Sequence, residues 1–494
     1  MAETFHNYIG GNWVAAKTGA TFESRNPAHP TQVLGVFQRS NAEDVAAAVA
    51  VAEKAHRSWR LTPAPHRADI ILKATMIIEQ RKEELAQLMT REMGKVISEA
   101  RGDVQEAIDM GKYISGEGRR MVGQTAPSEL RDKFAMLIRD SIGVVGLITP
   151  WNFPLAIPSW KIFPALVCGN GIVFKPAEDT PLVATRFVQI LEEAGVPGGV
   201  LNLVTGYGPE AGQPLLEDPR VRMISFTGSS DVGKLVAAEG GKRLKRVSLE
   251  LGGKNAILVM EDADIDLVVE GALWGGFGTS GQRCTASSRL IAHSAVASKV
   301  TEALLERVKA LKVGDGLDPA VQVGPVVNKK QLDRVHSYTG IGRAEGARLL
   351  VGGEVLSGEL DGGHYYAPTL FSEVTPSMRI AQEEIFGPTV GIIKVQNFDE
   401  AVEVANGTPY GLSLAIYTQD INRAFRAIRD LQAGLVYVNA PTIGAEIQLP
   451  FGGIKGTGNG HREAGTSAVE QFSELKTVYI DYSGKLQRAQ IDIE

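Results

Sequence analysis

The stretch Ile142-Gly-Val-Val-Gly-Leu-Ile-Thr-Pro-Trp-Asn-Phe-Pro154 decides the fold of this chain. Its apolar run, 142–148, ends in a loop with two prolines, and further short apolar runs follow at 171–174, 200–204 and 223–226. Turns rich in Gly or Pro and helix-like segments, such as 182–194, separate these runs. Because strands that alternate with helices pair in parallel, the pattern predicts a mostly parallel sheet with its functional loops at one edge.

The same alternation resumes after Glu250-Leu-Gly-Gly-Lys254, which has the character of a junction between two domains. In this second region we predict strands at 289–292, 389–395 and 412–417, and helices at 296–308 and 399–406. The sequence therefore predicts an α/β protein with two alternating regions.

Two helices are predicted before the first sheet. The segment 40–60 begins with Ser40 and Glu43, which match the S-x-x-E capping box, and an alanine-rich apolar repeat follows. The segment 65–94 carries apolar residues at helical spacing and predicts one long amphipathic helix. The β-prone runs 133–138 and 475–482 need a partner edge, so we expect them to pair with another subunit.

Composition excludes several classes of partner. The 494 residues include 51 Lys and Arg against 57 Asp and Glu, a net charge of −6, with no long basic run. This balance argues against nucleic acid or an anionic membrane as the main partner. The most apolar stretch, 143–174, contains several prolines and Lys161 and cannot form one membrane helix. No secretory signal is visible in Met1–His6, and two cysteines cannot form a disulfide framework, so we expect a cytoplasmic protein.

Cys284 is the first candidate for chemistry. It lies among small and polar residues, a setting compatible with an accessible thiolate. Cys168, in contrast, lies in an apolar run, where a thiol behaves as a small apolar side chain. A nucleophilic thiol with a separate carboxylate, Glu250, suggests covalent catalysis followed by base-assisted hydrolysis. The alternative is a free structural cysteine and a surface glutamate.

Two further segments follow predicted strands and suit a nucleotide. Thr227–Gly233 opens a helix, whose N-terminal N–H groups suit a pyrophosphate, although Leu235 stands where an NTPase loop needs Ser or Thr. Lys175 and Glu178 could bind ribose hydroxyls, and a carboxylate there disfavours a 2′-phosphate. The alternatives are a plain strand-to-helix turn and a solvated charge pair.

The loop Thr149–Pro154 presents a neutral hydrogen-bond donor. Prolines stiffen it on both sides of Asn152, whose amide can stabilise an oxyanion without a proton shift. The alternative is that Asn152 caps a helix.

Together these segments resemble the aldehyde dehydrogenase superfamily, in its hydrolytic NAD(P)-dependent branch. The resemblance covers nearly the whole chain, with seven motifs in matching order: 149–154, 174–178, 226–229, 250–254, 281–284, 384–388 and 450–455. Seven ordered motifs are far more specific than any one of them.

The resemblance implies roles for four catalytic residues. Cys284 would attack the aldehyde, and Asn152 with the Cys284 N–H would form the oxyanion hole. Glu250 would activate water, and Lys161 would lie near a proton path. The presence of Glu250 favours hydrolysis of the thioester over transfer to coenzyme A, the reaction of the acylating branch. It also disfavours a non-catalytic member of the family.

The cofactor implied is NAD, with NADP as the alternative. Glu384 and Phe386 would hold the nicotinamide ribose and ring, Lys175 and Glu178 the adenosine ribose, and Ser229 the pyrophosphate. The other cofactor contacts that the resemblance implies are Thr149, Pro150, Trp151, Gly228 and Leu251. No metal site is predicted.

The resemblance also implies a domain plan and an assembly. A Rossmann-like cofactor domain would comprise 1–124 and 142–251, and a catalytic domain 252–460. An oligomerisation arm with the C-terminal tail would comprise 125–141 and 470–494, giving a homodimer or homotetramer.

The substrate is a small aldehyde whose class stays open at this point. Phe153, Trp160 and Phe451 would supply an apolar wall. Arg283 could attract a distal carboxylate, or could form a structural ion pair directed away from the pocket. Residues 282–284 and 444–450 resemble 2-oxoglutarate-semialdehyde dehydrogenases, although Glu446 would repel an acid if it faced the pocket. The competing class is medium-chain aliphatic or aromatic aldehydes.

Overall fold

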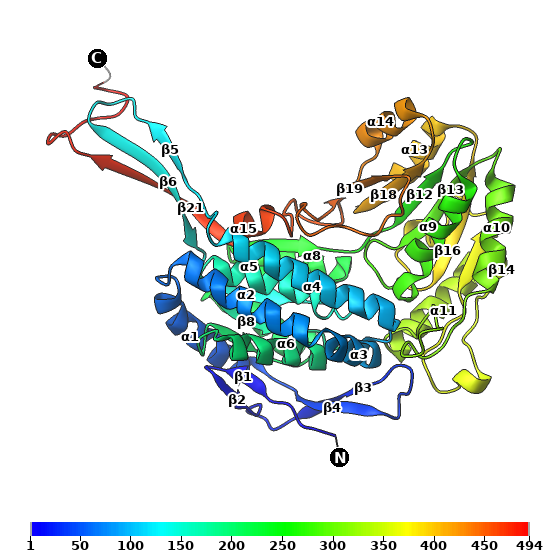
Figure 1. Cartoon of the computed structure of the whole chain (residues 1–494), viewed down its shortest axis with the longest axis horizontal. Helices are drawn as coiled ribbons and strands as arrows, with labels where there is room; N and C mark the ends of the chain where they lie inside the picture. The colour runs from blue at the N-terminus through cyan, green and yellow to red at the C-terminus, as the bar shows by residue number, and fades with distance from the viewer. Residues whose placement is uncertain (1, 493–494) are drawn as a thin grey trace.

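The stretch that begins at Ile142 lies at the centre of a seven-stranded sheet in the computed structural model, which describes residues 2–492 (Figure 1). Its strands, in spatial order, are β11 (Arg246–Glu250), β10 (Val221–Thr227), β7 (Val144–Ile148), β8 (Gly171–Lys175), β9 (Leu201–Leu203), β1 (Asn7–Ile9) and β2 (Asn12–Val14). The strands from β11 to β9 are parallel, and β1 and β2 add an antiparallel edge. The predicted α/β fold is confirmed.

Helices cover both faces of this sheet, because the strand side chains alternate between two cores. Val145, Leu147 and Phe174 pack with one set of helices, while Val144 and Val173 pack with the other. The first set is α2 (Ala64–Gln80), α3 (Lys82–Met93), α4 (Ile97–Glu117), α5 (Ala156–Val167) and α6 (Pro181–Ala194); the second is α1 (Ala42–Trp59), α7 (Gln213–Glu217) and α8 (Ser230–Lys242). Strands buried on both faces explain the unbroken apolar runs of the sequence.

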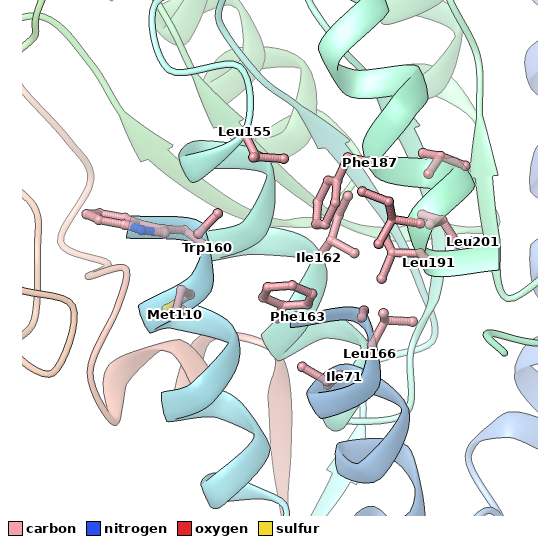
Figure 2. Close-up of a cluster of buried hydrophobic side chains, with 14 of the residues drawn as sticks. Ile71, Met110, Leu155, Trp160, Ile162, Phe163, Leu166, Phe187, Leu191 and Leu201 are labelled. Atoms are coloured by element: carbon pink, nitrogen blue, oxygen red, sulfur yellow. The ribbon is translucent and has the colours of Figure 1, made fainter. Parts of the chain in front are cut away.

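Figure 2 shows the larger of these cores around α5. Phe163 of α5 packs edge-on against Phe187 of α6 at a centroid distance of 5.5 Å, a contact that contributes about 1 kcal/mol beyond the area it buries. Trp160 points to the other side of α5, away from Phe163 and Phe187. This helix therefore presents one face to the core and another to the C-terminal loops.

A second seven-stranded sheet follows Lys254. Its order is β14 (Arg348–Val351), β15 (Thr369–Ser372), β16 (Thr389–Val395), β13 (Ser287–His293), β12 (Asn255–Val259), β18 (Ser413–Tyr417) and β19 (Leu435–Val438), all parallel except β14. One face packs against α9 (Ile265–Phe277) and α10 (Ala297–Lys309), and the other against α11 (Lys329–Ala344), α13 (Phe398–Asn406) and α14 (Ile421–Asp430).

A three-stranded antiparallel sheet projects from the body, as Figure 1 shows. It consists of β5 (Gln124–Pro127), β6 (Lys133–Ser141) and β21 (Ser473–Asp481), in the order β21-β6-β5. We call it the arm. The runs 133–138 and 475–482 thus pair with each other inside one chain, because β6 and β21 are matched over their full length. The membership of the three sheets supports the proposed division into cofactor domain, catalytic domain and arm.

Two predicted helical details are wrong. The helix expected over 65–94 is two helices, which meet at Arg81, where φ is −101° and ψ is 17°. The Arg81 side chain bonds Glu193 of α6 at 2.7 Å, a long-range contact that the local periodicity does not contain. The capping box of α1 is formed by Asn41 and Asp44, one residue later than Ser40 and Glu43.

Within residues 2–492, no helix combines the length and the apolar composition that are needed to cross a lipid bilayer.

Candidate active site

The loop before Cys284 has a backbone conformation that few side chains adopt. Thr279, Ser280 and Gly281 have φ angles of 50°, 56° and 68°. A Cβ on Gly281 would lie 2.1 Å from the carbonyl oxygen of Gly387, so this position requires glycine. Left-handed non-glycine residues cost about 1–3 kcal/mol each and persist where the surroundings hold them. Here Glu99 accepts hydrogen bonds from both the N–H and the hydroxyl of Thr279.

Cys284 is partly exposed, whereas Cys168 is buried in the core with its thiol 3.6 Å from the carbonyl oxygen of Val469. Burial raises the pKa of the Cys284 thiol to about 12, and the carboxylates of Glu384 and Glu250 add to this shift. Burial, followed by the charges of these two carboxyl groups, therefore disfavours the thiolate that the sequence suggested. The thiol must pass its proton to a base before it can attack.

Asn152 extends from the loop after β7 to the Cys284 loop. Its Nδ2 donates to the carbonyl oxygen of Gln282 at 3.1 Å, and its Oδ1 is buried with no partner among residues 2–492. The first turn of α5 has no side-chain cap, so Asn152 does not cap that helix. The second N–H of its amide is available to an oxygen on a substrate carbon bound to Cys284.

Glu250 ends β11 and is buried. Neither of its oxygens makes a hydrogen bond within the described part of the chain, and a Cβ on Gly452 would lie 2.4 Å from Oε1. Burial, followed by the neighbouring Glu463, raises the pKa of Glu250 well above its ordinary value. A buried carboxyl without partners and with a raised pKa is suited to accept a proton near neutral pH.

Lys161 lies deeper, behind Glu250. Its Nζ donates to the Ser225 hydroxyl at 2.8 Å and forms a buried ion pair with Glu463. Sequence reasoning missed Glu463, which follows no motif and reaches this place only because the C-terminal loop folds back over α5. Glu463 thus pairs with Lys161, and the charges of both residues act on Glu250.

The N-terminus of α8 fits an anionic group. Ser229 is its N-cap, and the hydroxyls of Thr227 and Ser230 are buried without a partner in the described residues. A Cβ on Gly228 would lie 2.5 Å from the ring of Phe226, and one on Gly233 would lie 2.3 Å from Leu251. Unpaired hydroxyls at a helix N-terminus are the donors that a pyrophosphate accepts from.

Lys175 is the last residue of β8, the strand beside β7, and Glu178 follows three residues later. Their side chains form an ion pair at 3.1 Å, with Lys175 buried and Glu178 37% exposed, so the carboxylate is open to a ligand. The Thr149 N–H donates to the carbonyl oxygen of Lys175 at 3.3 Å, which places the 149–154 loop beside this pair.

Glu384 and Phe386 come from the other half of the chain. The Gly253 N–H donates to Glu384 Oε1 at 2.9 Å, and burial raises the pKa of Glu384 to about 7. Phe386, in the left-handed region at φ 63°, packs edge-on against Trp151 at 5.4 Å, beyond Pro150. The loops from the two halves therefore meet over one site.

Two of the three aromatic side chains predicted for the substrate wall are in contact, and Arg283 is already paired. Trp160 packs edge-on against Phe451 at 5.0 Å, and the Arg283 guanidinium lies 5.3 Å from the centre of the Phe153 ring. The same guanidinium bonds Glu99 at 3.0 Å and the Thr279 hydroxyl at 2.9 Å. The structural ion pair thus exists, and it lies beside the pocket wall. Glu446 is exposed and bonds Gln448.

The site lies where the carboxyl ends of the strands of the first sheet, the end at which ligands of open α/β sheets bind, meet the loops that precede β13 and β16 of the second sheet. One half supplies Asn152, Glu250, Lys175 and Glu178, and the other supplies Cys284, Glu384 and Phe386. This fold and this site define a class: a two-sheet α/β protein that brings together a cysteine, a buried carboxyl group and a helix N-terminus suited to a phosphate.

Comparison with known proteins narrows the class. A model of the aldehyde dehydrogenase family matches residues 13–478. The alpha-ketoglutaric semialdehyde dehydrogenase of Bacillus subtilis strain 168 is 43% identical over 97% of this chain and 98% of its own length. The alpha-ketoglutarate semialdehyde dehydrogenase of Haloferax volcanii is 43% identical over 98% and 100%. The crystal structure of an NAD-dependent aldehyde dehydrogenase from Sinorhizobium meliloti has a TM-score of 0.95 and 37% identity, covering 99% of this chain and 96% of that one.

The chain therefore belongs to the aldehyde dehydrogenase family, and the resemblance drawn from its seven motifs is confirmed. It is an oxidoreductase that converts an aldehyde to a carboxylic acid.

Proposed function

We propose that this oxidation proceeds through a covalent thioester on Cys284, with Glu250 as the base. The observation that carries the proposal is a buried carboxyl without hydrogen-bond partners whose charge acts on the Cys284 thiol. Glu250 removes the thiol proton, and the sulfur then adds to the aldehyde carbon. The resulting alkoxide accepts hydrogen bonds from Asn152 Nδ2 and the Cys284 N–H.

Bound NAD supplies the acceptor for the hydride that leaves this carbon. The carbon is then a thioester of Cys284. Glu250 next takes a proton from water, the hydroxide adds to the thioester carbon, and the carbon–sulfur bond breaks. Carboxylic acid leaves and the thiol is restored. Glu463 and Lys161 offer the buried route by which Glu250 loses its proton between these steps.

The residues present fit NAD. The unpaired hydroxyls at the start of α8 would hold the pyrophosphate, with Ser229, and Lys175 with Glu178 the adenosine ribose. Glu384, Phe386 and Trp151 would hold the nicotinamide end, and the NAD-dependent relative from Sinorhizobium meliloti supports this cofactor.

Replacing Glu178 with Thr is expected to raise the ratio of kcat/KM with NADP to kcat/KM with NAD by about tenfold. The Glu178 carboxylate would lie beside the 2′-phosphate of NADP, and juxtaposed like charges cost several kcal/mol. Initial rates with each cofactor at saturating aldehyde measure this ratio. Glu193→Thr, which removes an exposed carboxylate from the far end of α6, serves as the control. An unchanged ratio in Glu178→Thr would remove Glu178 from the ribose site.

We further propose that the substrate is a semialdehyde with a distal carboxylate, as in 2-oxoglutarate semialdehyde. The names of the two relatives support this class, and so does an Arg283 guanidinium held beside Phe153. The pairing of Arg283 with Glu99 favours the second candidate, a generalist for alkyl and aryl aldehydes, since it offsets the positive charge.

Reduced-nicotinamide formation without coenzyme A, over a panel of aldehydes with and without a distal carboxylate, tests both proposals. We expect turnover to be fastest on carboxylated semialdehydes. Faster turnover of plain alkyl or aryl aldehydes would support the generalist. Turnover that required coenzyme A would overturn the role of Glu250 in hydrolysis.

The arm supports assembly into a homodimer or homotetramer. Its exposed side chains include the apolar residues Phe134, Ile138, Leu475, Tyr479 and Ile480. β5 and β21 are its two outer strands, so each leaves one edge without a partner strand in the sheet. Open edges and exposed apolar surface are features that a second copy of the chain would cover. We propose the cytoplasm as the compartment, as the composition suggests.

A further inference from the structure

The helix α11 is hydrogen-bonded to the loop that would hold the nicotinamide end of NAD. The Gln331 side chain donates to the carbonyl oxygens of Ile385 and Phe386 at 3.1 and 2.7 Å. The Arg334 guanidinium donates to the carbonyl oxygen of Glu384 at 2.6 Å. Phe386 has a left-handed backbone, which persists where the surroundings hold it. The first two turns of α11 therefore fix the backbone of this loop.

Close packing adds to these hydrogen bonds. A Cβ on Gly387 would lie 2.3 Å from the Val335 side chain of α11, so the loop lies directly on the helix. Ile385 is buried in the same apolar cluster as Leu332 and Val335. Any shift of α11 should therefore move the loop with it.

The turn that leads into α11 also contacts the loop of Cys284. The Ser280 hydroxyl donates to the carbonyl oxygen of Gly324 at 2.7 Å, and the Val327 N–H donates to Oε1 of Gln282 at 3.0 Å. The position of α11 is thus tied to the nucleophile as well as to the nicotinamide loop.

Asn328 joins the start of α11 to the first half of the chain. It is the N-cap of the helix, and its Oδ1 accepts from the Gln331 N–H at 2.8 Å. Its Nδ2 donates to Oδ1 of Asp179 at 2.8 Å, across 149 positions of sequence. Asp179 directly follows Glu178, the carboxylate proposed for the adenosine ribose, and accepts no other hydrogen bond within residues 2–492.

We propose that Asn328 is a positioning residue, which sets the nicotinamide loop relative to the adenosine-ribose loop and so aligns the nicotinamide for hydride transfer. The inference rests on the proposed placement of NAD, with Lys175 and Glu178 at one end and Glu384 and Phe386 at the other. The Asn328 side chain touches neither NAD nor substrate in this role. It acts through Asp179 on one side and through α11 on the other.

The variant Asn328→Ser separates the two bonds of this side chain. A serine hydroxyl is a good N-cap and keeps the start of α11, but it is too short to reach Asp179. We expect the Kd for NAD to rise by about tenfold, the value of one hydrogen bond to a charged group. The Kd for AMP, which reaches only the adenosine end, should stay unchanged. Isothermal titration measures both constants.

The primary deuterium isotope effect on kcat supplies a readout that a loss of stability would not move. The best substrate of the aldehyde panel is deuterated at its carbonyl carbon, so that only the hydride-transfer step carries the label. Misalignment of a reactant slows the step in which it reacts. We therefore expect a larger isotope effect in Asn328→Ser than in the unmodified enzyme.

Variants of Asp179 test the link from its other side. Asp179→Ala should reproduce both effects, whereas Asp179→Asn, which keeps an acceptor oxygen, should cause neither. The double variant of Asp179→Ala and Asn328→Ser should be no weaker than either single variant, because both remove the same bond. Asn397→Ser is the matched control: Asn397 is the N-cap of α13 and accepts from the Glu400 N–H, so it should change neither Kd nor isotope effect.

The outcomes distinguish this inference from the placement of NAD on which it rests. Equal weakening of NAD and AMP in Asn328→Ser, or no change in either, overturns the role of Asn328. Additive effects in the double variant overturn the link to Asp179. A Kd for AMP that Glu178→Ala leaves unchanged overturns instead the proposed adenosine-ribose site.

Discussion

Replacing Cys284 with Ala is expected to abolish dehydrogenase turnover, with a loss in kcat of about 10⁴-fold or more. No other thiol can take its place, because Cys168 is buried in the core and bonds the carbonyl oxygen of Val469. Without the sulfur no covalent intermediate forms, and the aldehyde carbon cannot release its hydride from an alkoxide. Reduced-nicotinamide formation at saturating aldehyde measures the loss.

Cys168→Ala is the matched control and should retain turnover. Alkylation by iodoacetamide adds an independent readout of the Cys284 thiol. Because its pKa is raised to about 12, the thiolate fraction and the alkylation rate should keep increasing with pH across the neutral and alkaline range. Substantial turnover in Cys284→Ala would falsify the covalent mechanism.

Replacing Glu250 with Gln is expected to lower turnover by about 10²–10⁴-fold, the usual contribution of a positioned base. The amide matches the carboxyl in shape, and the unmodified group makes no hydrogen bond within residues 2–492 that the change would break, so the fold should be retained. Both the removal of the thiol proton and the activation of water then lack their base. The pre-steady-state burst of reduced nicotinamide should therefore be lost together with steady-state turnover.

The pH profile supplies a second check on Glu250. Its pKa is raised by burial and by Glu463, so it is protonated at low pH and gains the ability to accept a proton as the pH rises through its pKa. The kcat of the unmodified enzyme should therefore increase with pH over that range, and Glu250→Gln should lose this increase. A variant that turned over normally would assign the base to another residue, and one that accumulated an acyl group on Cys284 would assign the removal of the thiol proton to another residue.

Much of the fold was predictable because parallel strands buried on both faces are unbroken apolar runs. The runs ending at Ile148, Phe174 and Phe226 became β7, β8 and β10 within one or two residues at most ends. β1 and β2 were not predicted, because strands of three residues carry little pattern. The break at Arg81 was not predicted either, because the apolar spacing continues across it.

The residues of the site also divide into those that the sequence predicts and those that it does not. Residues at strand ends, such as Asn152 and Glu250, carry local motifs and were predicted together. Glu463 has no motif, and its importance comes from the charged groups near it in space, Lys161 and Glu250. The pairing of Arg283 with Glu99 joins residues 184 positions apart, so the sequence alone could name Arg283 but could not choose between its two uses.

The nucleophile and its base belong to different sheets, and this has a consequence for the life of the chain. A polypeptide emerging from the ribosome has all the strands of the sheet that carries Glu250 before the last loop, which contains Gly452 and Glu463, is made and can close over the site. Until then the surroundings of Glu250, the proposed base, are incomplete. The enzyme therefore becomes active only after the last loop has folded. On heating, loss of contact between the two sheets should abolish the activity while each sheet is still intact.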